Sequence, residues 1–202
     1  MKNEERPQHQ ATARSRTVAT TVLMVATFMD LMDSTITNVA LPTIGKDLHA
    51  TPEQLEWTLA GYVIAFATLL ITGGRLGDIF GHRRIFVIGM VGFTLASLGA
   101  ALSQTGDLLV ATRVIQGAFA GIMVPQVLSS VQVMFAPEER APVLGIIGAL
   151  SSLGATGGLI LGGWLVTADL LGMGWRSIFL VNVPVGVVLV AAALLFVPRS
   201  RS

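Results

Sequence analysis

The feature that most constrains this sequence is a series of apolar stretches, each long enough to cross a lipid bilayer. A spanning helix needs roughly 20 predominantly apolar residues to cross about 30 Å of hydrocarbon. The stretches that qualify are residues 18–41, 57–74, 85–106, 108–135, 141–168 and 177–198. They use most of the 202 residues and leave only short connections. We therefore predict an all-α membrane protein with six transmembrane helices and two short tails, residues 1–16 and 199–202.

The composition argues against several classes of soluble protein. Charged residues make up 12% of the chain, about half of the roughly 25% that is typical of soluble globular domains. A sequence without cysteine and with a net charge of +1 is unlike a disulfide scaffold, a thiolate metal site or a basic nucleic-acid binder. The apolar stretches leave no room for a catalytic or nucleotide-binding domain. We therefore expect a protein that is not an enzyme and has no metal, cofactor or ATP site.

Most lysines and arginines outside the apolar stretches fall on one side of the predicted membrane. That side carries Lys2, Arg6, Arg14, Arg16, Arg75, Arg83, Arg84, Arg140, Arg199 and Arg201. The other side carries Lys46 and Arg176. Because loops rich in Lys and Arg stay in the cytoplasm, we predict a multi-pass protein of the cell membrane with both termini in the cytoplasm.

Three ionisable side chains interrupt the apolar stretches: Asp30 and Asp33 in the first and Arg113 in the fourth. The helical rise places Asp33 about 22 Å from the side where its stretch enters the membrane, and Arg113 about 7 Å from the opposite side. In about 30 Å of hydrocarbon these two depths coincide. We therefore predict that Asp33 pairs with Arg113. Asp30, one turn away on the same face, is then left to take a proton or a cation.

Two glutamines extend this candidate proton and substrate cavity. Gln116 follows Arg113 by three residues and shares its helix face, and Gln126 follows Pro125, where a kink frees a carbonyl group. Both side chains would either line a substrate path or form hydrogen bonds to a neighbouring helix. Intramembrane charges are costly and commonly functional. The alternative is a purely structural polar cluster that holds the first helix against the fourth.

The connection between the second and third stretches reads GRLGDIFGHRR from Gly74 to Arg84. Glycines such as Gly74 and Gly81 permit a tight turn and a close approach of helices. Asp78 can pair with an arginine or cap a helix, and Arg83 and Arg84 anchor the loop on the cytoplasmic side. An ordinary basic loop would explain the arginines but not the spacing of the glycines and the aspartate.

The fifth stretch carries glycines at helical spacing. Gly154, Gly158 and Gly162 follow one another at intervals of four residues, and Gly163 stands beside the last of them. Small residues at this spacing let two helix backbones approach closely. These glycines therefore either serve helix packing alone or form part of a functional motif.

Four segments resemble motifs of the major facilitator superfamily, in the order in which that family carries them. The Gly74–Arg84 segment resembles the family's cytoplasmic loop signature. LMDSTITNVALP at residues 31–42 resembles its first-helix motif, and RVIQG at residues 113–117 resembles its fourth-helix motif. WRSIFLVNVPVG at residues 175–186 is similar to the sixth-helix segment of the fourteen-helix drug:proton antiporter branch.

This resemblance implies the N-terminal six-helix half of a transporter, built from two inverted three-helix units, with the substrate site facing a second six-helix half. That second half would belong to the same chain in a longer protein or to a dimer partner. The resemblance also implies export of small lipophilic or cationic compounds such as drugs, driven by a proton gradient. The charged cavity would then bind proton and substrate, and the Gly74–Arg84 loop would act as a cytoplasmic latch.

The fifth helix departs from the family's antiporter motif, G-x-x-x-G-P-x-x-G-G. Leu159 stands where that motif has proline, so the motif does not by itself separate export from import. The alternative function is a non-transporting, truncated half that serves as a membrane scaffold or partner subunit.

Overall fold

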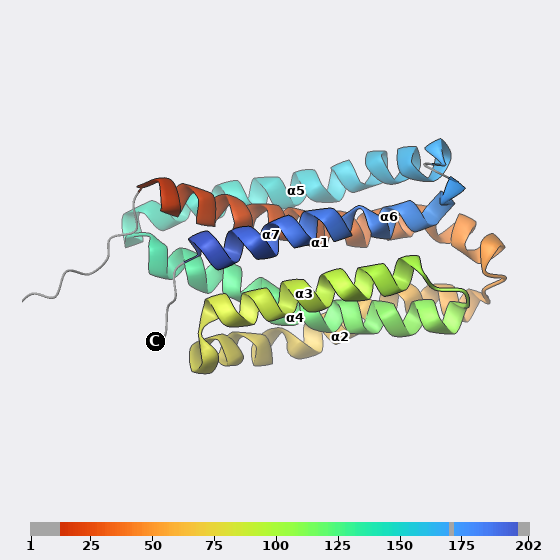
Figure 1. Ribbon diagram of the computed structural model, residues 1–202, viewed down its shortest axis with the longest axis horizontal. Coiled ribbons are helices and arrows are strands. Elements are labelled where there is room, and N and C mark those ends of the chain that lie inside the picture. Colours follow the sequence, from red (N-terminus) through yellow and green to blue (C-terminus); the bar gives the residue numbers. More distant parts are fainter. Residues whose placement is uncertain (1–12, 170–171, 198–202) are drawn as a thin grey trace, which may run out of the picture.

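The computed structural model describes residues 13–169 and 172–197, which form an all-α bundle (Figure 1). The long helices are α1 (Ala13–Asp47), α2 (Pro52–Phe80), α3 (His82–Ala101), α4 (Gly106–Met134) and α5 (Pro137–Ala168). After α5 come a 3₁₀ turn, η2 (Gly174–Arg176), and the helices α6 (Ser177–Leu180) and α7 (Asn182–Phe196). Within the described residues, six helical segments are long and apolar enough to cross a membrane. The predicted six-helix membrane fold is therefore confirmed.

The helices differ from the apolar stretches at their ends. α1 begins at Ala13, inside the predicted tail 1–16, so the last residues of that tail are helical. Residues 1–12 and the predicted tail 199–202 lie outside the described residues. Lys2, Arg6, Arg199 and Arg201, which contributed to the predicted orientation, therefore lie outside the described residues as well.

Two of the apolar stretches are shorter or less regular as helices than predicted. α3 ends at Ala101 rather than at residue 106, and Thr105 begins the next helix as its N-cap. The Thr105 side chain accepts a hydrogen bond from the Leu108 amide at 3.3 Å, which satisfies a donor that the first turn of α4 leaves free. The sixth stretch comprises α6 and α7, and Val181 between them keeps helical dihedral angles (φ −61°, ψ −29°).

The helices pack in a pattern that repeats along the chain. α2 lies along α4, and α5 lies along α1; α3 contacts α4, and α7 contacts α1 (Figure 1). If α1, α2 and α3 are matched with α4, α5 and α7, each of these contacts has its counterpart. Many transporter folds are built from two such units of inverted topology, and this packing is the pattern that they produce.

Glycines allow α5 to lie against α1. A Cβ atom on Gly158 would lie 2.6 Å from Thr35 Oγ1, and Gly154 and Gly162 face α1 at similarly short range. Gly163, by contrast, has no neighbouring atom within 4 Å of a built Cβ. Three of the four predicted packing glycines therefore make the helix contact, and Gly163 points away from the bundle.

The corresponding contact between α2 and α4 also depends on glycine. Cβ atoms on Gly117 and Gly121 would collide with the backbone carbonyls of Tyr62 and Phe66 on α2. Small residues remove this barrier and let the two backbones approach closely. The close approach places Tyr62 beside the part of α4 that carries Arg113.

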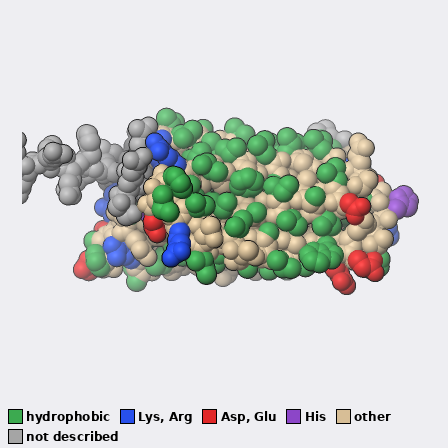
Figure 2. Space-filling model, turned by 90° about the horizontal axis from the view of Figure 1, so that it is seen from below, with side chains coloured by type: hydrophobic (Ala, Val, Ile, Leu, Met, Phe, Trp, Pro, Cys, Tyr) green, Lys and Arg blue, Asp and Glu red, His purple; other side chains and the backbone are tan. Residues whose placement is uncertain are grey.

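Charged side chains gather at the two ends of the bundle, and apolar side chains cover the length between them (Figure 2). At the end where the described chain both begins and stops, Arg16 forms an ion pair with Glu139 at 2.8 Å. At the other end, the Asp47 carboxylate accepts hydrogen bonds from Trp175 Nε1 at 2.9 Å and from Arg176 Nη1 at 2.6 Å. An apolar band between charged ends suits a bilayer.

The glycine contact between α5 and α1 generates a prediction with a matched control. Gly158→Ala forces a methyl group against Thr35, so we expect it to lower the free energy of unfolding by about 1–3 kcal/mol. Gly157→Ala places the same methyl group in open space and should leave that free energy nearly unchanged. Unfolding of the purified full-length polypeptide in detergent micelles measures both variants, and equal effects would contradict the packing described here.

Candidate functional site

The middle of the bundle holds an ion pair between α1 and α4. Arg113 Nη1 lies 2.5 Å from Asp33 Oδ2, and the two side chains are 1% and 0% exposed. The pairing expected from helix depth is therefore present. Leaving either charge buried without the other would be strongly unfavourable, so the position of each side chain depends on its partner.

Uncharged side chains complete the surroundings of this pair. The second carboxylate oxygen, Asp33 Oδ1, accepts hydrogen bonds from Gln116 Nε2 at 3.0 Å and from Asn182 Nδ2 at 2.6 Å. Arg113 Nη1 also donates to Gln116 Oε1 at 2.7 Å, and Arg113 Nε donates to the Thr58 carbonyl at 3.3 Å. Gln116 therefore bridges both members of the pair, as its spacing from Arg113 led us to expect.

Asp30 lies one helical turn from Asp33 and has a different partner. The Tyr62 hydroxyl on α2 donates a hydrogen bond to Asp30 Oδ1. The Tyr62 ring also lies against the guanidinium of Arg113, with 4.3 Å between Arg113 Cζ and the ring centroid. Asp30 is 6% exposed and forms no ion pair within the part of the chain that the structure describes. Sequence analysis missed Tyr62, because an aromatic residue in an apolar stretch carries no signal of this kind.

Asn182 reaches the same site from the sixth apolar stretch and was also missed as a site residue. Besides contacting Asp33, its Nδ2 donates to Ser97 Oγ on α3 at 3.0 Å, and Ser97 donates in turn to the Phe179 carbonyl at 3.0 Å. The signal that would have found it is a lone amide side chain inside an apolar stretch. The motif at residues 175–186 contains that amide, but its sequence does not indicate what the amide contacts.

Gln126 lies apart from this cluster, so the structure does not bring it together with the other predicted cavity residues. It sits about 20 Å further along α4 than Arg113. Its Nε2 donates to the Gly73 carbonyl at 2.7 Å and to the Ile122 carbonyl at 3.0 Å, and its Oε1 lies 2.9 Å from His82 Nδ1. The hydrogen bond to a neighbouring helix, the second interpretation of this residue, is the one present.

The residues predicted to form a latch surround the junction of α2 and α3. Gly74 and Asp78 lie in the last turns of α2, Gly81 lies between the two helices, and Arg83 and Arg84 lie in the first turn of α3, so the predicted loop is mostly helical. Gly81 adopts a φ of 95°, a backbone conformation that favours glycine, and its amide donates to the Gly77 carbonyl at 2.8 Å. Asp78 Oδ1 lies 3.7 Å from Nε2 of His82. His82 itself is 5% exposed, although its place in the sequence predicted a loop residue.

The remaining latch residues have three different surroundings. The Arg83 guanidinium donates to the carbonyl of Leu194 near the end of α7, and Arg84 is exposed. A Cβ atom on Gly74 would meet Pro125 at 3.9 Å, an ordinary contact distance. Close packing therefore does not explain a glycine at position 74.

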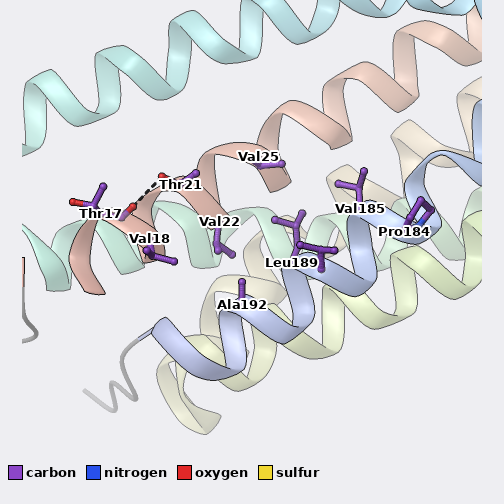
Figure 3. A pocket seen from close by; sticks show the side chains of 10 residues that line it. Thr17, Val18, Thr21, Val22, Val25, Pro184, Val185, Leu189 and Ala192 are labelled. Carbon is purple, nitrogen blue, oxygen red and sulfur yellow. Dashed lines mark hydrogen bonds between the residues drawn. The ribbon is translucent and has the colours of Figure 1, made fainter. Parts of the chain in front are cut away.

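An apolar groove of about 520 Å³ lies between α1 and α7 (Figure 3). It is near the end of the bundle that carries Arg16, Arg83, Arg84 and Arg140, called here the arginine-bearing end. Val22, Val25, Val185 and Leu189 are among its lining residues, with Thr17 towards the end. Its lining contains no charged side chain. The groove is therefore separate from the buried ion pair.

A six-helix membrane bundle that buries a charge cluster in its middle is characteristic of a membrane transporter domain. Residues 23–202 match the Major Facilitator Superfamily. The chain therefore belongs to that superfamily, whose members are transporters and not enzymes.

Relatives in this family include resistance and export proteins. The chain is 44% identical over 187 residues to the probable actinorhodin transporter of Streptomyces coelicolor, covering 93% of this chain and 32% of that protein. It is 38% identical over 185 residues to the tetracenomycin C resistance and export protein of Streptomyces glaucescens, covering 92% of this chain and 33% of that protein. The chain thus spans about a third of the length of these relatives.

Solved structures share the fold. The proton:xylose symporter XylE superposes with a TM-score of 0.81 at 16% identity, over 93% of this chain and 46% of that chain. A bacterial homolog of the human lysosomal transporter Spinster, in an inward-facing conformation, gives a TM-score of 0.79 at 19% identity, over 95% of this chain and 47% of that chain. The six helices described here therefore correspond to part of the fold of each.

The buried ion pair leads to a prediction about stability. Arg113→Leu leaves the Asp33 carboxylate without its cationic partner, so we expect a loss of about 3–5 kcal/mol in the free energy of unfolding. The double variant Asp33→Asn with Arg113→Leu removes both charges and should be more stable than Arg113→Leu alone. Unfolding of the full-length polypeptide in micelles distinguishes them; a double variant with the summed loss of both single variants would show that the charges are not coupled.

Proposed function

We propose that this chain is the N-terminal six-helix half of a proton-driven exporter in the cell membrane, for small lipophilic or cationic compounds such as drugs. The observation that carries the proposal is the buried cluster of Asp30, Asp33 and Arg113, in which Arg113 pairs with Asp33 while Asp30 accepts a hydrogen bond from Tyr62. The relatives named as resistance and export proteins support outward transport. Leu159, which replaces the proline of the antiporter motif, does not by itself decide the direction.

The formal charges of the cluster explain how one site exchanges a proton for a substrate. Two carboxylates and one guanidinium leave a single negative charge in a buried site, which is costly in a membrane. A proton on Asp30 cancels that charge, and so does a cationic group beside it. Because the two compete for one charge, proton entry on one side is coupled to substrate release on the other.

The second half of the transporter would cover the exposed apolar faces of α2 and α5. These helices are the least buried of the long spans, and their exposed residues include Ile71, Leu153, Ile160 and Trp164. Gly163 also faces outwards, and a small residue there permits a close approach of another helix. We assign these faces to a second six-helix half, in the same chain of a longer protein or in a dimer partner, which rocks against this half around the site.

We place the arginine-bearing end of the bundle in the cytoplasm, together with both termini. Positively charged loops are retained on that side. Arg16 lies near the start of α1, Arg75 near the end of α2, Arg83 and Arg84 at the start of α3, and Arg140 near the start of α5. The α2–α3 turn then lies at the cytoplasmic mouth of the site. There it serves as a latch that engages the second half in one of the two transport states.

Replacing the proposed proton carrier tests this mechanism. Asp30→Asn keeps the shape of the side chain but cannot lose a proton, so ethidium uptake into everted vesicles that carry the full-length polypeptide should fall at least about tenfold under an imposed pH gradient. Glu138→Gln, an exposed acid at the start of α5, serves as the control and should transport normally. Asp30→Asn with the wild-type rate and pH dependence would rule out Asp30 as the proton carrier.

A second candidate function is a non-transporting half that acts as a scaffold or partner subunit. The intact mass of the natively expressed polypeptide, carrying an N-terminal tag, separates the two candidates. A product of roughly twice the 21.3 kDa of this chain or more is expected for one half of a single-chain transporter. A stable product near 21.3 kDa that transports nothing, even beside a matched second half, would favour the scaffold.

A further inference from the structure

A buried amide oxygen at the intramembrane site has no hydrogen-bond partner. The Asn182 side chain is 1% exposed, and its Oδ1 is without a partner among the residues that the structure describes. Its Nδ2, by contrast, donates twice, to Asp33 Oδ1 at 2.6 Å and to Ser97 Oγ at 3.0 Å. Buried polar atoms are usually satisfied, so an exception requires a physical explanation.

The explanation lies in what the two neighbours of the amide require. A carboxylate has no hydrogen to donate, so Asp33 forms hydrogen bonds only with donor groups. Ser97 directs its own hydroxyl hydrogen to the Phe179 carbonyl and also accepts from the amide. Asn182 therefore turns its NH₂ group to both neighbours, and its oxygen is left without a donor. The amide could exchange the positions of its NH₂ group and its oxygen only if the Asp33 carboxyl carried a hydrogen, or if the Ser97 hydroxyl no longer donated to the Phe179 carbonyl.

The helical hydrogen bonding is weakened close to Asn182. Val181, between α6 and α7, keeps helical dihedral angles (φ −61°, ψ −29°), and its amide donates to the Ser177 carbonyl at 3.1 Å. Pro184, however, lacks the amide hydrogen that would continue the helical hydrogen bonds. The same short segment also contacts the other member of the ion pair, because the Phe179 ring centroid lies 5.7 Å from Arg113 Cζ. One short segment of the sixth span thus touches both charges, the carboxylate through an amide and the guanidinium through a ring.

We propose that Asn182 is a positioning residue that couples the charge state of Asp33 to the shape of the sixth span around Pro184. When the carboxylate carries no proton, the amide donates to it and holds this segment in the conformation described here. When the carboxyl is neutralised, the amide is free to rotate, and the backbone next to Pro184 follows. The coupling gives the sixth span a means of responding to proton or substrate at the site.

The charged and titratable side chains around Asn182 determine which other signals could drive the rotation of its amide. Asp30 on α1, Tyr62 on α2 and Arg113 on α4 are the other charged or titratable side chains at the site. α3 and α5 carry charged side chains only near their ends, and α7 carries none. The charges of Asp33 and of these three neighbours are therefore the local signal that Asn182 receives.

A single reporter thiol tests the coupling without using transport. The chain contains no cysteine, so Val183→Cys supplies a unique thiol beside Pro184. Any cysteines in the rest of a longer full-length polypeptide are replaced first. The labelling rate with a membrane-permeant maleimide is then compared with and without Asp33→Asn, which mimics the neutralised carboxyl. We expect Asp33→Asn to change this rate by about fivefold or more. In an Asn182→Leu background, the same substitution should change it little.

Control variants separate coupling from a general loosening of the bundle. Ser34→Ala alters the neighbouring residue on α1, which does not contact Asn182, and should leave the labelling rate unchanged. Size-exclusion chromatography reports whether each variant is folded, and Asn182→Ser replaces Asn182→Leu if the latter is not. The proposal is overturned if Asp33→Asn has no effect on labelling, or if its effect persists at full size without the amide.

The inference deepens the proposed function, because it rests on Asp33 and Arg113 forming the transport site, yet the two can fail separately. If Asp30→Asn abolishes ethidium transport while labelling does not respond to Asp33→Asn, only the role of Asn182 is wrong. If labelling responds but Asp30→Asn transports normally, the proposed proton carrier is wrong and the coupling stands.

Discussion

The structure depends on keeping one ion pair buried in the middle of a membrane bundle. Asp33 and Arg113 are almost completely removed from solvent, and a charge in that position is tolerated only when its partner and its hydrogen bonds are supplied by the protein. Gln116 and Asn182 supply the hydrogen bonds to the carboxylate, and Tyr62 places its ring against the guanidinium. These groups come from four of the membrane-spanning segments, so the pair holds together helices that are distant in the sequence.

The two glycine contacts give the bundle the geometry that this pair requires. α4 approaches α2 at Gly117, and α5 approaches α1 at Gly158. Lipid tails are as apolar as the helices themselves, so close packing and interhelical hydrogen bonds must supply the association that water would otherwise drive. The equivalent contacts in the two three-helix units place α1 and α4, which carry the charges, at corresponding positions. Tyr62 meets Arg113 because α2 lies against α4 at this distance.

The fold and part of the site were predictable from the sequence for reasons that individual residues illustrate. The depth of Asp33 and Arg113 followed from helical rise, and their contact at 2.5 Å agrees with it. Gln116 followed from its spacing on the same helix. The contacts of Tyr62 and Asn182 could not be predicted, because each acts across a helix–helix contact. An aromatic or amide side chain has no sequence pattern that reports which neighbour it will face.

The number of spans and the depth of each charge could be predicted from the sequence, because hydropathy and helical rise describe positions along the axis of each helix. The superfamily could be predicted because its motifs are contiguous segments. Which helices are neighbours, and which face each one turns inwards, became known from the three-dimensional structure. Rotation about the helix axis is set by packing between helices, and the position of a residue along the chain does not contain it. That is why Gln126 joins His82 at the α2–α3 turn instead of the charged site, while Asn182, far along the chain, reaches Asp33.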